Sequence, residues 1–202
     1  MGYPYIAENL FLMILLSLTA VAGDYMVIHL NSKGYQAISD NVTHAVIGGL
    51  SWFIVCFNCK RYTHRTLLEI FSCTFFASII DIDHFVAARS LRLKDATNLY
   101  SRPILHCSTV PLVLIVTLTV LAFLTQSKCI MVCSLIMLTA FGSHHTRDAT
   151  RRGYWFYPYG STPPIPYRYY ILITIAIPFC ISHFLNFYLQ LEMYTRREHI
   201  TV

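Results

Sequence analysis

Histidines and aspartates recur in this sequence as pairs that are three or four residues apart. Residues at these spacings lie on the same face of a helix, so each pair would direct an imidazole and a carboxylate the same way. The pairs are Asp40 and His44, Asp81 and His84, His144 and Asp148, and His145 and Asp148. Imidazole nitrogens and carboxylate oxygens together suit zinc, manganese or iron. The pattern predicts a divalent-metal site, with zinc or manganese as the expected ion.

The candidate site divides into ligands, catalytic carboxylates and supporting residues. Asp81 and Asp83 are the expected catalytic carboxylates, because a metal lowers the pKa of bound water and a nearby carboxylate takes the proton. Asp24 and Asp40 are expected to support the ligands by hydrogen bonding, as carboxylates behind metal-bound histidines do. The expected metal ligands are His44, His84, His106, His144, His145 and Asp148.

Three arginines complete the candidate site. Arg102, Arg147 and Arg151 are expected to bind an anionic group of a substrate, since the guanidinium fork matches phosphate oxygens. The alternative is that Arg147, Arg151 and Arg152 anchor the chain at a membrane surface or set its orientation. The aromatic stretch 154–160 is expected to form an interfacial aromatic belt, or else to roof the polar cluster.

Each polar residue also has a purely structural interpretation. A single histidine such as His44 or His106 more often makes a hydrogen bond between helices than binds a metal. The Asp81–His84 cluster is also typical of a helix cap, and Asp24 is a suitable partner for an arginine of a neighbouring loop.

The composition indicates the elements that must position these residues. Apolar residues make up 55% of the 202 residues and charged residues only 12%, with a mean hydropathy of +0.52. Soluble domains usually carry about 25% charged residues. The figures exclude a disordered chain, a nucleic-acid-binding protein and an ordinary soluble enzyme. They favour an integral, multi-pass membrane protein whose surroundings are the lipid bilayer.

Long apolar runs are separated by polar loops, as that class requires. A helix needs about 20 mostly apolar residues to cross a bilayer, and the second and fifth runs are short enough to be tilted or re-entrant. Ala20-Val21-Ala22 leaves open a cleaved signal peptide as an alternative for the first run. The sequence predicts an all-α polytopic bundle of about six spans, forming one membrane-embedded domain over residues 1–202. The expected spans are 9–30, 42–58, 67–88, 105–125, 129–143 and 169–191.

Acidic residues divide between the two sides of this six-span arrangement. All six aspartates and six of the nine histidines fall on one side or near it, whereas all four glutamates fall on the other. Because several helix ends deliver aspartate and histidine to one membrane depth, we expect a shared polar site at that mouth of the bundle.

The polar motifs resemble those of the transmembrane protein 267 family, in order and with compatible spacing from about residue 24 to residue 178. This resemblance implies a multi-span topology without an assigned activity. The motifs are Asp40-Asn41-x-x-His44-x-x-x-Gly48, Ser78-Ile79-Ile80-Asp81-Ile82-Asp83-His84-Phe85, Arg102-Pro103-x-Leu105-His106-Cys107-Ser108-Thr109, Ser143-His144-His145-x-Arg147-Asp148 and Arg152-Gly153-x-Trp155-x-x-Pro158-x-Gly160.

A more distant similarity is to the bacterial LexA-binding, inner-membrane-associated metal-dependent hydrolases. The chain departs from their pattern after His106, where it lacks a second Thr-His, and His144 or His145 would have to replace that histidine. The resemblance implies hydrolytic chemistry at a polar site. The positions that match are His44, Asp81, Asp83, His84, His106 and Asp148.

The favoured function is a metal-dependent hydrolase that acts on a lipid or lipid-linked phosphoester at headgroup depth. The first alternative is a non-enzymatic membrane protein in which the His/Asp cluster is structural. The second is a transporter of protons or divalent ions, which is less favoured because only His183 continues the ionisable groups deep into the other half.

Overall fold

The computed structural model describes the backbone from residue 3 to residue 200 and the side chains from residue 5 to residue 194. The described chain is almost entirely helical and also contains a two-stranded antiparallel ribbon. The long helices are α1 (Tyr3–His29), α2 (Lys33–Asn58), α3 (His64–Ile79), α6 (Thr109–Thr125), α7 (Lys128–Arg152) and α8 (Tyr167–Ile200). The short elements are the 3-10 turns η1 (Ile80–Ile82) and η2 (Ile104–His106), the helices α4 (Asp83–Ala88) and α5 (Leu93–Ala96), and the strands β1 (Trp155–Phe156) and β2 (Gly160–Ser161).

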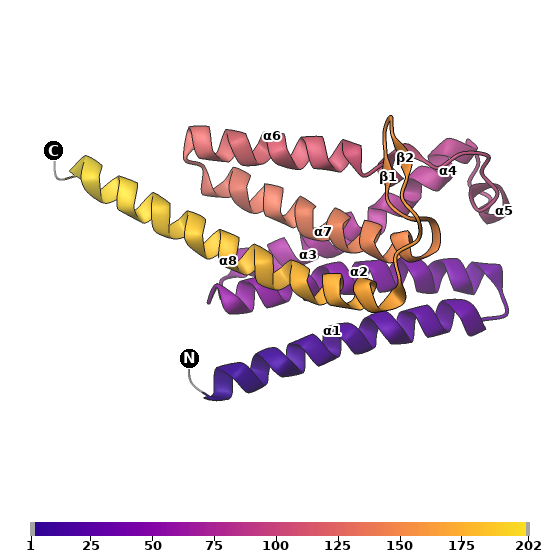
Figure 1. Cartoon of the computed structure of the whole chain (residues 1–202), viewed down its shortest axis with the longest axis horizontal. Coiled ribbons are helices and arrows are strands. Elements are labelled where there is room, and N and C mark those ends of the chain that lie inside the picture. The colour runs from indigo at the N-terminus through magenta and orange to yellow at the C-terminus, as the bar shows by residue number, and fades with distance from the viewer. Residues whose placement is uncertain (1–2, 201–202) are drawn as a thin grey trace.

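The long helices run along one axis of the molecule as a bundle, and both chain ends lie at the end opposite the β1–β2 ribbon (Figure 1). This arrangement confirms the predicted all-α bundle. Within the described chain, five helical segments are long and apolar enough to cross a membrane. The sixth predicted span, α6, has 17 residues and a length of about 26 Å, slightly less than the thickness of a bilayer core.

The helix boundaries differ from the predicted ones at the polar end of the bundle. The second and fifth spans were expected to be short, yet α2 begins at Lys33 and α7 continues to Arg152. Their additional turns are polar, and they remain helical because their side chains pair with one another inside the protein. The fourth span is shorter than expected, since residues 104–106 form a 3-10 turn before α6.

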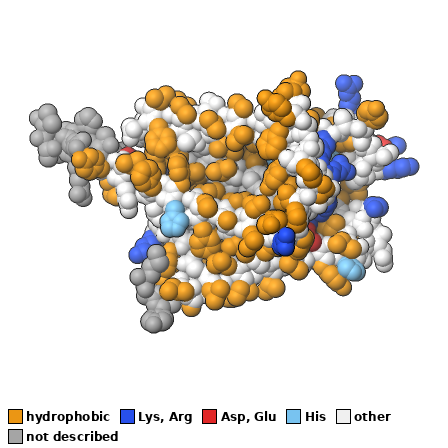
Figure 2. All heavy atoms as spheres, in the orientation of Figure 1, with side chains coloured by type: hydrophobic (Ala, Val, Ile, Leu, Met, Phe, Trp, Pro, Cys, Tyr) orange, Lys and Arg blue, Asp and Glu red, His pale blue; other side chains and the backbone are white. Residues whose placement is uncertain are grey.

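Two apolar clusters hold the helices together. One surrounds Trp52, Cys73 and Leu135 between α2, α3 and α7, and the other surrounds Leu16 and Ile47 between α1 and α2. Apolar side chains also cover the outside of the bundle along its length (Figure 2), as lipid contact requires. On the same view, most lysines and arginines gather at the end that carries α4, α5 and the ribbon.

Two consecutive glycines bring α2 against α3. A Cβ atom on Gly48 would lie 2.6 Å from the Cβ of Ala77, and one on Gly49 would lie 2.2 Å from Oγ1 of Thr74. Small residues let membrane helices approach closely. This contact sets the distance between His44, one turn before Gly48, and the polar end of α3.

Candidate metal centre

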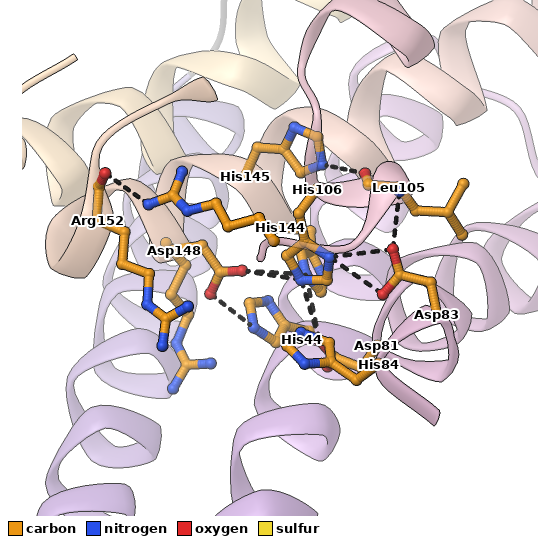
Figure 3. A network of polar contacts seen from close by, with 12 residues as sticks. His44, Asp81, Asp83, His84, Leu105, His106, His144, His145, Asp148 and Arg152 are labelled. Carbon is orange, nitrogen blue, oxygen red and sulfur yellow. Dashed lines mark hydrogen bonds and ion pairs between the residues drawn. The ribbon is translucent and has the colours of Figure 1, made fainter. Parts of the chain in front are cut away.

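The predicted polar residues converge at the end of the bundle that carries the ribbon. Figure 3 shows side chains from α2, η1, α4, η2 and α7 directed toward one another. The sequence prediction of one shared cluster on several helix ends therefore agrees with the geometry. The residues that meet are His44, Asp81, Asp83, His84, His106, His144 and Asp148.

The spacing of the innermost donor atoms matches that around a tetrahedral metal ion. The Nε2 atoms of His106 and His144 are 3.4 Å apart, and Oδ2 of Asp148 lies 3.3 and 3.4 Å from them. Oδ1 of Asp81 lies 3.5 Å from each of the same two nitrogens. Ligands bound about 2.0–2.1 Å from a tetrahedral ion are separated from one another by about 3.3–3.4 Å. Each of these two triangles of atoms has the dimensions of one face of a zinc site.

Three histidines are oriented by hydrogen bonds at the ring nitrogen that faces away from the cluster. Such bonds place the proton on Nδ1 and leave Nε2 free as a ligand, which is the usual arrangement behind a metal-bound histidine. The Nδ1 partners are the Ala77 carbonyl for His144 (2.9 Å), the Ala96 carbonyl for His84 (3.2 Å) and the Asp83 carboxylate for His106 (3.2 Å).

His44 is the least satisfied group of the cluster. It is 2% exposed, and its ring stacks on His144 with centroids 3.7 Å apart. Its Nε2 lies 3.5 Å from Oδ1 of Asp148, and neither ring nitrogen makes a hydrogen bond to any described residue. Buried polar atoms normally have a partner, and an ion bound at Nε2 would supply one.

The cluster carries an excess of negative charge around His106. Burial alone would lower the pKa of this imidazole, but its hydrogen bonds to Asp148, Asp81 and Asp83 raise the pKa to about 11. The protein atoms alone therefore favour a cation at this point.

Asp81 lies in the 3-10 turn η1 and Asp83 begins α4, so the α-helix α3 ends before the Asp81-x-Asp83 motif. Both aspartates contact His106, Asp81 at its Nε2 and Asp83 at its Nδ1. Asp83 accepts hydrogen bonds from the Leu105 backbone N–H (2.7 Å) and from His106, so it lies behind the histidine. In this position Asp83 orients His106, whereas the sequence analysis expected it to be a catalytic carboxylate.

His145 was predicted to be a ligand, and the structure contradicts this. Its Nε2 donates to the Leu105 carbonyl at 2.9 Å, and its Nδ1 lies 3.0 Å from the Ser108 hydroxyl. Both ring nitrogens are occupied, so neither is free for a metal. His145 instead fixes the η2–α6 connection against α7, and this holds the neighbouring His106 in place.

The arginines mostly bind protein groups. Arg147 is fully buried and pairs with Asp24 (2.9 Å) and Asp40 (2.6 Å), which corrects the predicted roles of all three residues. Arg147 cannot reach a substrate there, and the two aspartates neutralise arginine instead of supporting histidines. Arg151 also pairs with Asp40, at 2.8 Å, but it lines the cavity beside the cluster.

Arg102 has a capping role. Its guanidinium donates to the carbonyls of Arg152 (2.6 Å) and Gly153 (3.1 Å), so it closes the C-terminal end of α7. Arg102 still lines the cavity, as the prediction of a substrate-binding arginine requires. Its two hydrogen bonds to backbone carbonyls leave fewer donors for a substrate than predicted.

A polar cavity of about 160 Å³ opens onto the cluster, with room for several water molecules. Asp81, His106 and Asp148 line it, and Tyr154 and Trp155 form part of its wall, as the roof alternative for stretch 154–160 expected. A larger, mostly apolar groove of about 490 Å³ lies beside it between α2 and α4–α5. The two hollows share Asp40, Asp81 and His84 in their linings.

The sequence interpretation did not include Arg152 in the candidate site. This residue lines the cavity, and its side chain makes no hydrogen bond or ion pair with any residue that the structure describes. It lies four residues after Asp148, so the same helical spacing that identified His144 would have placed it on that face.

The glutamates lie away from the cluster, as expected. Glu69 pairs with Arg61 (2.6 Å) and Glu192 with Lys128 (3.2 Å), which lie at the starts and ends of helices far from the ribbon. The side chain of Glu198 lies outside the described residues.

Comparison with known proteins identifies relatives that share the name transmembrane protein 267. The chain is 44% identical to the Xenopus laevis protein over 71% of its own length, 43% identical to the Mus musculus protein over 73%, and 42% identical to the Bos taurus protein over 75%. The matched regions span 66%, 67% and 70% of these relatives, so the chain covers about two thirds of their length. No protein-family model and no solved structure matches, so the more distant resemblance to bacterial hydrolases is not supported.

Proposed function

The chain belongs to the transmembrane protein 267 family, and we propose that its polar cluster is a divalent-metal centre that hydrolyses a lipid or lipid-linked phosphoester. The observation that carries this proposal is the triangle of His106 Nε2, His144 Nε2 and Asp148 Oδ2, with edges of 3.3–3.4 Å. Three protein ligands with an open fourth position are typical of catalytic zinc sites.

Hydrolysis at such a centre needs activated water and a proton acceptor. A bound divalent ion supplies the activated water, because it lowers the pKa of a bound water molecule toward neutrality. Asp81 and Asp148 both line the cavity, and either carboxylate is placed to accept the proton.

The surroundings of the centre support a phosphoester of a lipid as the substrate. Arg152 lines the cavity without a protein partner, so its guanidinium is available to a phosphoryl oxygen. The apolar groove beside it has a volume of about 490 Å³, which suits a hydrocarbon chain, and it includes Ile38, Val42 and Phe85 in its lining. A headgroup in the cavity and a chain in the groove would meet at Asp81 and His84.

The first prediction concerns metal content and turnover. Detergent-purified protein is expected to contain a stoichiometric transition metal by elemental analysis and to hydrolyse lipid phosphate esters in micelles. His144→Ala and Asp148→Asn should reduce turnover to the value of chelator-treated protein and lower the metal content, because each removes one corner of the triangle. His183→Ala is the matched control, since His183 is an exposed histidine of α8 outside the cluster.

The two measurements separate the alternatives. Protein without metal that is otherwise folded would overturn the proposal and favour a structural His/Asp cluster. Protein with metal but without turnover on any lipid phosphoester would retain the metal centre and overturn the hydrolase assignment.

A further inference from the structure

The cluster contains more donors than one ion can use. Besides Asp83, which lies behind His106, six side chains face the centre, whereas a tetrahedral ion binds four ligands and a catalytic one commonly three from the protein. The six are His44, Asp81, His84, His106, His144 and Asp148.

We propose that the centre binds two divalent ions, one held by His44 and His144 and one held by His84 and His106, with the Asp81 carboxylate bridging them. This inference rests on the proposed metal centre, but it concerns the number of ions and not the reaction.

The donor atoms form three triads. Two of them have Asp81 in common and share no histidine: one donor atom each from His44, His144 and Asp81 lie within 4.8 Å of one another, and the same holds for His84, His106 and Asp81. The third triad, His106, His144 and Asp148, takes one histidine from each of these, so in a two-ion centre its three side chains face both ions. A carboxylate has two oxygens and can bridge two metals, whereas a single imidazole nitrogen cannot. The division of four histidines into two pairs around one aspartate is therefore the arrangement that a two-metal centre needs.

His44 supplies an independent reason for a second ion. An ion bound by His106, His144 and Asp148 alone leaves this buried imidazole without a hydrogen bond, although the Asp148 carboxylate lies 3.5 Å from its Nε2. An ion held by His44 and His144 gives that Nε2 a partner, and the Nε2 atoms of both histidines lie within 3.5 Å of the Asp148 carboxylate.

His84 is likewise oriented by a hydrogen bond so that it can bind the other ion. Its Nδ1 bonds to the Ala96 carbonyl of α5, and its ring meets that of His106 edge-on with centroids 4.7 Å apart. The remaining nitrogen, Nε2, is thus the one available to the cluster. The α4–α5 segment therefore has a clear role, because it orients a ligand.

The charges of the cluster are consistent with two ions. Asp81, Asp83 and Asp148 are three carboxylates, and the nearby pair Arg147 and Arg151 is already neutralised by Asp24 and Asp40. Two divalent ions offset these three carboxylates and leave a net positive charge, which Arg102 and Arg152 in the cavity wall increase and which an anionic substrate would balance. Pairs of ions about 3.5–4 Å apart are common in enzymes that cleave phosphoesters.

The experiment is a titration of metal-stripped, detergent-purified protein with Mn²⁺ and, separately, with Zn²⁺. We expect two equivalents of either ion per chain, and an exchange-coupled electron paramagnetic resonance signal from the Mn²⁺ form. His84→Ala and His44→Ala should each bind one equivalent and lose the coupled signal, since each removes a ligand of one ion. His183→Ala and His29→Ala, which change exposed histidines outside the cluster, should still bind two.

A wild-type protein that saturates at one equivalent would overturn the two-ion proposal and leave the proposed metal centre intact. Binding of no ion would overturn both. Two equivalents without a coupled signal, unchanged by His44→Ala and His84→Ala, would place the second ion elsewhere and also overturn the proposal.

Discussion

His144 and His145 are adjacent in the sequence, yet their side chains have different tasks. A helix turns by about 100° per residue, so His144 faces the cluster while His145 faces the η2–α6 connection. His144 keeps Nε2 free because the Ala77 carbonyl binds its Nδ1, whereas both nitrogens of His145 are already bonded. Which histidine is a ligand thus depends on hydrogen-bond partners from distant segments, and spacing alone cannot distinguish the two.

For a single residue, we predict the effect of Asp83→Asn on metal affinity. The substitution keeps the acceptor for the Leu105 N–H but removes the charge behind His106, so it should weaken Zn²⁺ affinity about 10- to 100-fold without changing the number of ions bound. Competition with a chelating dye measures the affinity. Asp95→Asn is the control, because this aspartate bonds Ser90 outside the cluster. Complete loss of binding would mean that Asp83 is itself a ligand.

Among the elements, the end of α7 and the ribbon that follows it cover the site. Gly153 ends α7 with φ of +68° and ψ of 170°, a conformation that is essentially restricted to glycine. A Cβ atom there would lie 1.8 Å from the Thr162 carbonyl oxygen. The glycine therefore lets the ribbon fold back over α7, where Tyr154 and Trp155 reach the cavity wall.

Gly153→Ala should lower the melting temperature of the detergent-solubilised protein, with a loss of stability above about 1 kcal/mol, because it adds a backbone clash to an unfavourable φ. Gly160→Ala is the matched comparison. Gly160 also has a positive φ, of +93°, but a Cβ atom there meets nothing within 4 Å. We expect the smaller loss for Gly160→Ala, and equal losses would show that the contact with Thr162 does not matter.

The sequence predicted most of the helices and part of their role in positioning the site. The six apolar runs identified the long helices, because a helix that spans a membrane needs a long run of apolar residues. The polar turns of α2 and α7 lay outside the predicted spans, although their Asp and His residues had helical spacing, because they are stable at that depth only through partners on other helices. The turn η1 was likewise hidden, because residues 80–82 carry no proline or glycine to mark it.

At the scale of the whole molecule, the two ends of the bundle carry different features. The site, α4, α5 and the ribbon lie at one end, and both chain termini lie at the other (Figure 1). Between them the surface is apolar, including Val113, Val116 and Leu124 of α6, which are 59%, 53% and 77% exposed. Lipid is the environment that such a surface requires, and the proposed metal centre then lies near one face of the bilayer.

Epitope tags test this topology. A tag at Leu91, beside the site, should be accessible from one side of the membrane, and a tag at Gln126, in the α6–α7 turn, from the other. A tag at Tyr62 should behave like the one at Gln126, since it lies in the α2–α3 connection at the same end. Antibody binding before and after selective permeabilisation measures the sides. Tags at Leu91 and Gln126 on one side would show that the 17-residue α6 does not cross the bilayer.

The buried pairing of Arg147 with Asp24 and Asp40 has a consequence for biogenesis. Asp24 and Arg147 are 123 positions apart, and Asp40 and Arg147 are 107 apart, so ribosomes complete α1 and α2 long before they make α7. The N-terminal hairpin enters the bilayer with two carboxylates whose counter-charge does not yet exist. Unpaired charge in lipid is costly. The nascent hairpin must therefore wait at the translocation machinery, or in contact with water, until the fifth long helix arrives to complete it.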